Sequence, residues 1–413
     1  MQNEPLRVTC CVAGGGPAGM MVGLLLARAG VETVVLERHA DFLRDFRGDT
    51  VHPSTLQIMA ELGVLEEFLK RPHQKISIIH GLIGDDEIAL GDFSRLNTTC
   101  KFMAMMPQWE FLNFVAETGA RYPDFQVLMR HDVTELLDDG GRIVGVRAET
   151  PEGPLDIYAD LVIAADGRHS TVRDLAGFEV TDIGAPIDVL WMRLSKKPTD
   201  PDAVLGRMKN GAVLVTLDRG DYWQCAYVIK KGGNDALRAR GLDAFHQDIV
   251  RIAPFFADRV GELEDWEQVK LLTVAINRLK RWWKPGLLCI GDAAHAMSPV
   301  GGVGINLAVQ DAVAAANILA APLLAGTIGT GDLDAVQRRR TLAMRVIQKL
   351  QVAIQERIID PVLKTDKPVK APAAMKLFNK YPSLRWLPAR VVGLGVRPEH
   401  VRSPEADTPL AET

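Results

Sequence analysis

The first 37 residues carry the pattern that most restricts how this chain can fold. A short apolar strand is expected over residues 8–13, a helix over 18–29 and a second apolar strand over 32–37, and a run of glycines joins the first strand to the helix. Apolar strands that alternate with helices are typical of a parallel sheet buried on both faces. The sequence therefore predicts an α/β fold that begins with a strand–helix–strand unit.

The glycine run fits the pattern GxGxxG, which favours a dinucleotide site over an ordinary glycine-rich turn. The first glycine makes a tight turn, the second lets a pyrophosphate approach the backbone, and the third lets the helix pack on the strand. The helix N-terminus offers N–H groups and a partial positive charge to phosphates, and an acid at the end of the second strand is placed to bind ribose hydroxyls. The expected contacts are Gly14, Gly16, Pro17, Ala18, Gly19, Glu37 and Arg38.

Charge and cysteine content argue against several other classes of protein. The 48 Lys+Arg and 52 Asp+Glu residues give a net charge of −4, unlike a nucleic-acid-binding protein held by phosphate contacts. The five cysteines form no CxxC pair, so we expect no disulfide framework, no metal site and a reducing, cytoplasmic location. The apolar run over 312–328 contains Asn317 and Pro322 and is expected to be a buried helix.

The hydrophobic pattern changes twice beyond the first unit. Helices are expected over 53–69 and 108–120, and residues 125–165 are rich in strands, with a tight hairpin turn at 138–141. Long strands with aromatic residues follow over 184–230 in a block that we expect to be antiparallel, and helices dominate from residue 305. No internal repeat or low-complexity linker separates these parts, so we expect interleaved domains.

Two further motifs each follow a buried apolar strand. The first begins with Asp166 and Gly167, and the second contains Asp292 and a glycine-rich run that leads to a helix expected to start near Val303. A carboxylate at such a position can accept hydrogen bonds from a polyol chain, and the glycines let the backbone approach a flat ring. The positive end of the helix can stabilise a negative charge that develops on that ring, as on a reduced flavin.

Together the three motifs resemble those of the aromatic-hydroxylase family of flavoproteins, which has the para-hydroxybenzoate hydroxylase fold. This family of group A flavoprotein monooxygenases includes ubiquinone-pathway and polyketide hydroxylases, and the motif order matches it up to about Asn317. The resemblance implies an FAD-binding Rossmann-like (GR2-type) domain interleaved with an antiparallel β-sheet substrate domain, and a helical C-terminus. The expected boundaries are 1–75, 100–180 and 280–325 for the FAD-binding domain, 76–99 and 181–279 for the substrate domain, and 326–413 for the C-terminal segment.

The resemblance also assigns cofactor contacts outside the glycine loop. It implies that Asp292 binds the ribityl oxygens of FAD and that Val133 supplies a backbone contact to the adenine. Arg47 and Gln108 would reach the cofactor from segments that otherwise suggest polar surface. The remaining implied contacts are Asp166 and Gly167, linked to FAD and nicotinamide handling, and Pro299, Gly302, Gly304, Ile305 and Asn306 along the isoalloxazine ring.

A monooxygenase cycle follows from the resemblance: NADH or NADPH reduces FAD, O2 forms a peroxyflavin, and the distal oxygen passes to an electron-rich substrate. The residues expected near this reaction are His52, Asp49 and Pro299. His52 precedes a proline, so a helix-entry role is an equal alternative. His295 is interpreted as a packed histidine hydrogen-bonded to backbone rather than as a catalytic group.

Substrate contacts are expected on the antiparallel block, where Trp191, Met208, Trp223 and Tyr227 alternate along the strands. Core packing is the alternative for any one of them. No Arg–Tyr set suited to a small carboxylated phenol is evident, so the hypothesis is a larger aromatic, polyketide or quinone-like substrate. The competing functions are a reductase or dehydrogenase of isoprenoid-type substrates and a non-catalytic FAD-binding redox sensor.

The C-terminal part is basic, because residues 340–402 contain 13 Lys or Arg and 4 Asp or Glu. With Leu350, Phe378, Trp386 and Leu387 in the same stretch, a weak contact with an anionic membrane or a partner is one interpretation. A solvated basic face over the core is the interpretation we favour, since such faces are common on soluble helices. A monomer or a homodimer is expected.

Overall fold

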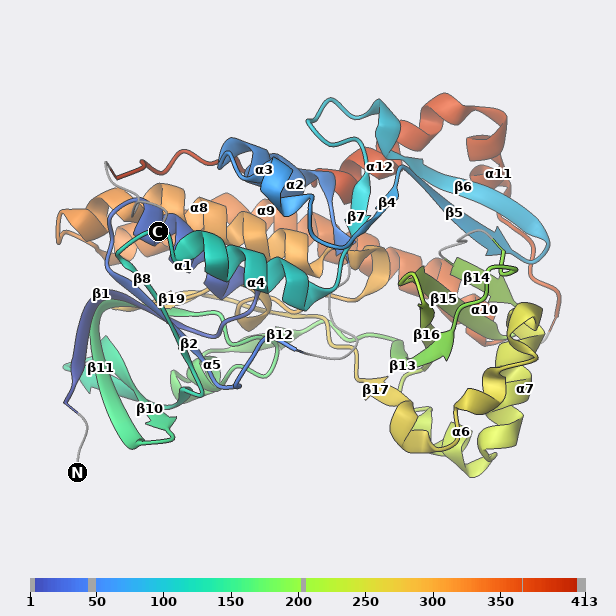
Figure 1. Cartoon of the computed structure of the whole chain (residues 1–413), viewed down its shortest axis with the longest axis horizontal. Coiled ribbons are helices and arrows are strands. Elements are labelled where there is room, and N and C mark those ends of the chain that lie inside the picture. The colour runs from blue at the N-terminus through green and yellow to red at the C-terminus, as the bar shows by residue number, and fades with distance from the viewer. Residues whose placement is uncertain (1–3, 44–49, 202–205, 366, 407–413) are drawn as a thin grey trace.

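The computed structural model describes residues 4–43, 50–201, 206–365 and 367–406, and it is built around two β-sheets and a layer of long helices (Figure 1). The sheet that contains β1 lies at the left of Figure 1, and the sheet that contains β13 to β16 lies at the right. This architecture confirms the predicted mixed α/β fold class. The division into domains by residue number stays a prediction.

The first sheet is the predicted parallel core. Its strands follow the order β19–β20–β11–β1–β2–β8, and β10 and β9 extend it from β11 as an antiparallel pair. β1 pairs in parallel with both β2 and β11, which confirms the strand–helix–strand unit and places the first strand in the middle of the sheet. The strands are β1 Leu6–Ala13, β2 Thr33–Glu37, β8 Phe125–Met129, β9 Asp132–Asp139, β10 Arg142–Thr150, β11 Gly153–Ala164, β19 Trp283–Lys284 and β20 Leu287–Cys289.

Four helices pack along this sheet in one layer: α1 Pro17–Arg28, α4 Gln108–Gly119, α8 Gly304–Leu324 and α9 Thr330–Ile354 (Figure 1). α1 contacts both α4 and α8, and nearly all of its residues are buried. Glycine also lets α1 pack closely on the sheet, since a Cβ on Gly23 would lie 2.6 Å from Val35 Cγ2 on β2. α8 is apolar and long enough to cross a membrane, but 72% of its most apolar window is buried in the protein, which is typical of a core helix.

The second sheet confirms the antiparallel block expected over 184–230. Its order is β17–β13–β16–β15–β14–β5–β6, with one parallel pairing, between β14 and β5. α7 covers one face and α10 contacts the other. The elements are β5 Ile78–Ile83, β6 Asp86–Asp92, β13 Ile187–Ser195, β14 Gly206–Lys209, β15 Ala212–Asp218, β16 Tyr222–Lys230, β17 Lys270–Leu272, α6 Asn234–Ala239, α7 Leu242–Ile252 and α10 Asp360–Leu363.

The single helix expected over 53–69 is wrong. The structure has α2 Pro53–Glu61 and a separate short α3 Leu65–Phe68. Gly63 separates them at φ +75°, in the left-handed region where glycine ends helices. Apolar residues recur at helical spacing on both sides of Gly63, so the hydrophobic pattern does not reveal where the first helix ends.

The C-terminal part consists of helices followed by an extended segment that returns to the first sheet's helices. Asn317 Oδ1 on α8 accepts hydrogen bonds from the backbone N–H groups of Arg402 and Ser403, and Arg28 on α1 pairs with Glu405. The remaining elements are β3 Thr50–Val51, β4 Gln74–Ile76, β7 Met103–Met105, β12 Val180–Asp182, β18 Asn277–Leu279, α5 Thr171–Leu175, α11 Ala373–Lys380, α12 Trp386–Gly393, the 3₁₀ turns η1 Phe93–Arg95, η2 Pro254–Phe256, η3 Val260–Glu262, η4 Trp266–Gln268, η5 Gly291–Ala293, η6 Val300–Gly302 and η8 Pro382–Arg385, and the π turn η7 Gln355–Ile359.

Candidate cofactor and substrate site

The glycine loop between β1 and α1 is shaped by contacts that admit no side chain. A Cβ on Gly14 would lie 2.6 Å from Ala165 O, and one on Gly19 would lie 1.9 Å from Gly14 O. The N-cap residue, Gly16, supplies no side-chain hydrogen bond to α1, and Pro17 has no N–H. The helix therefore presents its first N–H groups and its positive end to the space beside the loop, which fits a phosphate group.

Glu37 ends β2 beside this loop and is buried. Its Oε2 accepts a hydrogen bond from Gly15 N at 3.1 Å, and its Oε1 accepts one from His39 N at 3.0 Å. His39 Nδ1 also lies 2.5 Å from Oε1, a partner that the sequence analysis missed although it stands only two residues beyond the acid. Arg38 is exposed, and Val133 lies on β9 in the core. The carboxylate is thus fixed at the edge of the phosphate site.

Asp166 organises the second motif. It accepts a hydrogen bond from Ser170 Oγ through Oδ1 and one from Val172 N at 3.0 Å through Oδ2, so it orders the start of α5. Burial raises the pKa of Asp166, although these hydrogen bonds oppose the change. The neighbouring Gly167 turns the chain at φ +87°. The motif follows β11, next to the parallel β1, so its loop lies beside the first glycine loop.

Asp292 completes this edge of the site from the end of β20. Arg168 Nη2 lies 3.4 Å from Asp292 Oδ2, and the Asp292 side chain is 28% exposed. Gly291, at φ +59°, packs on α1, since a Cβ there would lie 3.0 Å from Ala18 Cβ. The carboxyl ends of three parallel strands therefore bring all three motifs together.

The residues assigned to the flavin ring gather where α8 begins. Pro299 precedes η6, Gly302 stands at φ +62°, and the α8 N-cap residue Val303 makes no side-chain hydrogen bond. Gly304 and Ile305 form the first turn of α8. The backbone of this turn can face a ring and stabilise negative charge on it.

Asn306 holds the neighbouring strand and helix against this turn. Its Oδ1 accepts hydrogen bonds from His52 N at 2.8 Å and Thr55 Oγ1 at 2.7 Å, and its Nδ2 donates to Thr50 O at 3.2 Å. Thr50 Oγ1 donates to Gly302 O at 2.7 Å. Asn306 is thus an anchor between α8 and the β3–α2 segment, in addition to its predicted place along the ring.

His52 is fully buried and is the N-cap residue of α2, which is the helix-entry position considered from the sequence. Its Nδ1 lies 2.8 Å from Val392 O, so Nδ1 carries the proton and donates it. Burial, opposed in part by this hydrogen bond, lowers the pKa of His52 from 6.5 to about 4. The histidine is therefore neutral at physiological pH.

The His52 pKa predicts an acid-sensitive fold. The unfolded chain takes up a proton near pH 6.5 and the folded chain only near pH 4, so the contribution to stability is complete above pH 6.5 and falls as the pH drops towards 4. The full loss is about 3 kcal/mol, since one pKa unit corresponds to about 1.36 kcal/mol, and about 2 kcal/mol of it falls between pH 7 and pH 5. His52→Asn keeps a donor towards Val392 and should lack this loss. Urea unfolding of both proteins at pH 7 and pH 5 measures it; equal pH dependence would contradict the assignment.

Two predicted residues, Arg47 and Asp49, lie outside the described residues. Gln108 is the first residue of α4 and is half-buried. The sequence led us to expect that His295 would be hydrogen-bonded to backbone. Instead, its Nε2 lies 2.6 Å from the side-chain atom Asp311 Oδ2. That part of the interpretation is wrong, although His295 is packed and buried as expected.

The four aromatic or sulfur-containing residues proposed for substrate do not share one face of the second sheet. Trp223 and Tyr227 are buried against the α7 side, where Trp223 Nε1 donates to Asp200 Oδ2 at 2.7 Å and Tyr227 packs on Phe245. This is the core packing given as the alternative. Trp191 and Met208 lie on the opposite face and are only partly buried.

Comparison with known proteins supports what the geometry indicates. A family model described as "FAD binding domain" matches residues 7–350. The chain belongs to this FAD-binding family. Within curated proteins, it is 33% identical over 383 residues to 6-methylpretetramide 4-monooxygenase of Streptomyces rimosus, covering 92% of this chain and 91% of that protein. It is 26% identical over 343 residues to para-nitrophenol 4-monooxygenase of Pseudomonas sp. (strain WBC-3), covering 80% and 82%.

Solved structures of two other proteins show the same fold. OxyS anhydrotetracycline hydroxylase from Streptomyces rimosus superposes with a TM-score of 0.74 at 22% identity, covering 94% of this chain and 76% of that chain. p-Nitrophenol 4-monooxygenase PnpA from Pseudomonas putida DLL-E4 gives a TM-score of 0.72 at 22% identity, covering 94% and 96%. With the family match and the curated relatives, the chain is an FAD-dependent monooxygenase.

Proposed function

We propose that this monooxygenase uses NADH or NADPH and O2 to hydroxylate an aromatic, polyketide or quinone-like substrate. The convergence of the three motifs, with Gly14 against Ala165, Gly291 against Ala18 and Asp292 beside Arg168, is the observation that carries the proposal. The relative that is 33% identical is a 6-methylpretetramide 4-monooxygenase, which favours the polyketide option among these substrates. A cytoplasmic location fits this proposal.

The chain's own residues would hold FAD along a line across the strand ends. The glycine loop and the α1 N-terminus bind the pyrophosphate, Glu37 binds ribose hydroxyls, and Asp292 accepts hydrogen bonds from the ribityl chain. The α8 N-terminus stabilises negative charge on the ring. FAD, when bound, supplies hydride acceptance and the reaction with O2. The backbone N–H of His52 donates to Asn306 on α8, and a pKa of about 4 makes its buried ring a weak base, so an anchoring role suits His52 better than proton acceptance.

The substrate would lie between the ring position and the Trp191 face of the second sheet. Apolar side chains that are only partly buried share this face, and Val300, next to the predicted ring contact Pro299, packs in the same cluster as Trp191 and Met208. An apolar surface of this kind excludes water and suits a flat aromatic ligand. Residues 76–99 and 181–279 are accordingly proposed as the substrate-binding part.

Trp191→Ala should raise the KM for substrate about tenfold with little change in FAD content. An apolar side chain of this size contributes about 1.5–3 kcal/mol to binding when it is covered, and about 1.4 kcal/mol corresponds to tenfold. Trp266→Ala is the matched control, because Trp266 is also half-buried but packs on Phe245 on the α7 side. Steady-state NAD(P)H oxidation measures both; an equal effect of the two substitutions would place the substrate elsewhere.

The proposed reaction is tested by the flavin spectrum and by the product. The purified protein should bind FAD, NADH or NADPH should bleach it without oxygen, and substrate should accelerate the bleaching. Readmitted ¹⁸O2 should then appear in the hydroxylated product. A reduced product without ¹⁸O would favour the reductase, and bound FAD with no substrate-stimulated oxidation would favour a redox sensor.

A weak contact with an anionic membrane, the alternative interpretation of the basic C-terminal stretch, is supported by the side chains exposed there. Exposed apolar side chains gather there, interleaved with cationic ones such as Lys380 and Arg390, and the combination matches an anionic lipid surface. Flotation with phosphatidylglycerol vesicles, against phosphatidylcholine vesicles, should show weak, salt-sensitive binding. No binding would leave a solvated face, and a dimer in light scattering would point to a second copy. The exposed apolar residues are Leu377, Tyr381, Leu384, Trp386 and Leu387.

A further inference from the structure

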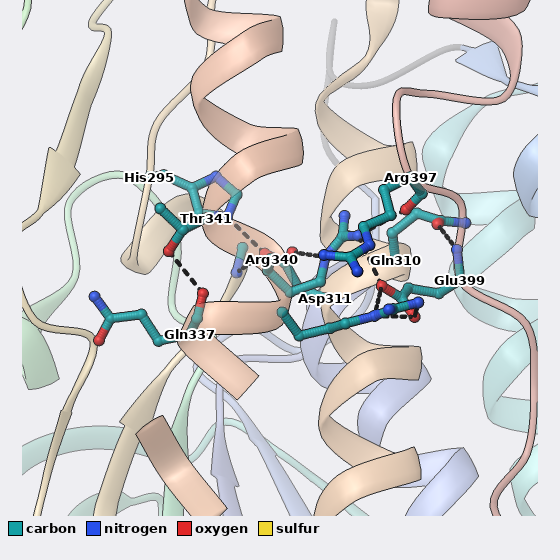
Figure 2. Close-up of polar contacts among 10 residues, drawn as sticks. His295, Gln310, Asp311, Gln337, Arg340, Thr341, Arg397 and Glu399 are labelled. Atoms are coloured by element: carbon teal, nitrogen blue, oxygen red, sulfur yellow. Dashed lines mark hydrogen bonds and ion pairs between the residues drawn. The ribbon is translucent and has the colours of Figure 1, made fainter. Parts of the chain in front are cut away.

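A network of buried charged side chains joins His295 to α8, α9 and the C-terminal segment (Figure 2). At its centre, Asp311 Oδ2 lies 2.6 Å from His295 Nε2 and accepts a hydrogen bond from Gly291 N at 3.1 Å. Asp311 Oδ1 accepts a hydrogen bond from Arg340 Nε at 2.8 Å. All three side chains are about 1% exposed. A charge this deeply buried is costly unless it is paired, and here each one is.

The network continues into the C-terminal segment. Arg340 Nη1 lies 3.2 Å from Glu399 Oε1 and donates to Arg397 O at 3.3 Å, and Arg339 forms a two-point pair with the Glu399 carboxylate. Glu399 N donates to Gln310 Oε1 on α8 at 2.5 Å. Figure 2 shows these groups converging from two helices, a loop and the C-terminal segment. The Asp311 and Glu399 carboxylates are thus paired with the guanidinium groups of Arg339 and Arg340.

Asp311 stands out because it reaches a cofactor motif directly. The N–H that it binds belongs to Gly291, which immediately precedes Asp292 and packs on Ala18 at the glycine loop. Its second contact, His295, ends the same turn. One carboxylate therefore holds both ends of the turn that carries Asp292. An apolar residue at position 311 could fill the space but could not fix this turn.

We propose that Asp311 is a positioning residue that fixes the Gly291–His295 turn, and thereby Asp292, for binding the ribityl chain of FAD. The inference rests on the proposed placement of FAD. Asp311 itself touches no cofactor and acts through the turn. Glu399 anchors the C-terminal segment to the same network but makes no contact with the turn, so it supplies stability rather than position.

Two substitutions separate these roles. Asp311→Asn keeps the size of the side chain but removes the charge and one acceptor, and Glu399→Gln makes the matched change at the far end of the network. We expect Asp311→Asn to raise the Kd for FAD about tenfold, or about 1.4 kcal/mol, and Glu399→Gln to lower Tm without changing that Kd. Flavin fluorescence on dilution of the holoprotein gives the Kd, and a thermal scan gives Tm.

Substitution of His295 covers the case in which Asp311→Asn does not fold. His295→Gln can still donate to Asp311 and should keep the wild-type Kd, whereas His295→Leu cannot and should raise it. An unchanged Kd in both Asp311→Asn and His295→Leu, or an equal rise in Glu399→Gln, would overturn the inference. Failure of the wild-type protein to retain FAD would instead overturn the proposed function.

Discussion

Replacing Gly19 with alanine is expected to give a protein without bound FAD. The new Cβ would lie 1.9 Å from Gly14 O, a backbone atom in the turn that shapes the phosphate site. α1 would have to move away from β1, and it cannot do so freely because α4 and α8 pack on it. Overpacking of this kind costs about 1–3 kcal/mol, and here the strain falls on the site itself. The purified variant should show no flavin absorbance and a lowered Tm.

Gly16→Ala tests whether the glycine loop needs space for a bound phosphate rather than for the protein's own packing. The nearest heavy atom to a Cβ on Gly16 is Ala165 O at 4.0 Å, and φ is −76°, so alanine fits the protein. Its methyl group would occupy the space offered to the pyrophosphate, so we expect an unchanged Tm and a Kd for FAD about tenfold higher. Gly331→Ala, in the first turn of α9 with open space around it, should leave the Kd for FAD unchanged and should not lower Tm. Wild-type affinity in Gly16→Ala would contradict a phosphate at this position.

Arg340→Leu is expected to have the largest effect on stability. It would leave the Asp311 carboxylate, about 1% exposed, without its guanidinium partner, and Glu399 with only Arg339. Burial alone would raise the pKa of Asp311, but the His295 and Arg340 interactions hold it below its ordinary value, which shows how far the charge depends on them. Removing one partner of a buried pair costs about 3–5 kcal/mol. Urea denaturation at pH 7 measures the change.

Arg338→Leu is the matched control on the same helix. Arg338 pairs with Asp334 one turn away, and its side chain is 72% exposed. Exposed pairs contribute about 0–1 kcal/mol, so this variant should unfold close to the wild type. A loss below about 1 kcal/mol in Arg340→Leu would mean that water or rearranged side chains satisfy Asp311 and Glu399.

Local patterns in the sequence were sufficient to predict the fold of the part of the molecule that contains the glycine loop. The glycine spacing predicted the turn, the apolar strands predicted the parallel sheet, and Glu37 follows from its place at the end of β2. Parallel strands bring their carboxyl ends to one edge, and the structure places Asp166 and Asp292 beside the glycine loop in this way. These features depend on neighbours a few residues apart or on a rule of sheet topology.

Features that depend on register or on distant pairing were not predictable from one sequence. Strand alternation places Trp223 and Tyr227 on one face, but Trp191 pairs with Ala226, so it faces the other side. No periodicity in the sequence indicates that register. Asp311 and Glu399 are far apart along the chain, and each resembles an ordinary charged residue on a helix or in a loop until the fold brings Arg340 between them.

The order of strands in the first sheet determines when each strand can find its neighbours while the chain is being synthesised. β1 is made first, yet its neighbour β11 comes about 150 residues later, and β20, beyond β11, appears only after residue 286. Until β11 is made, β1 can pair only with β2, and α1 lacks its partner α8 until residues 304–324 have been made. Contacts so distant in sequence form slowly. Chains truncated before β20 should therefore aggregate. The folding yield of full-length chains should rise most with chaperones that bind the chain while it is still on the ribosome.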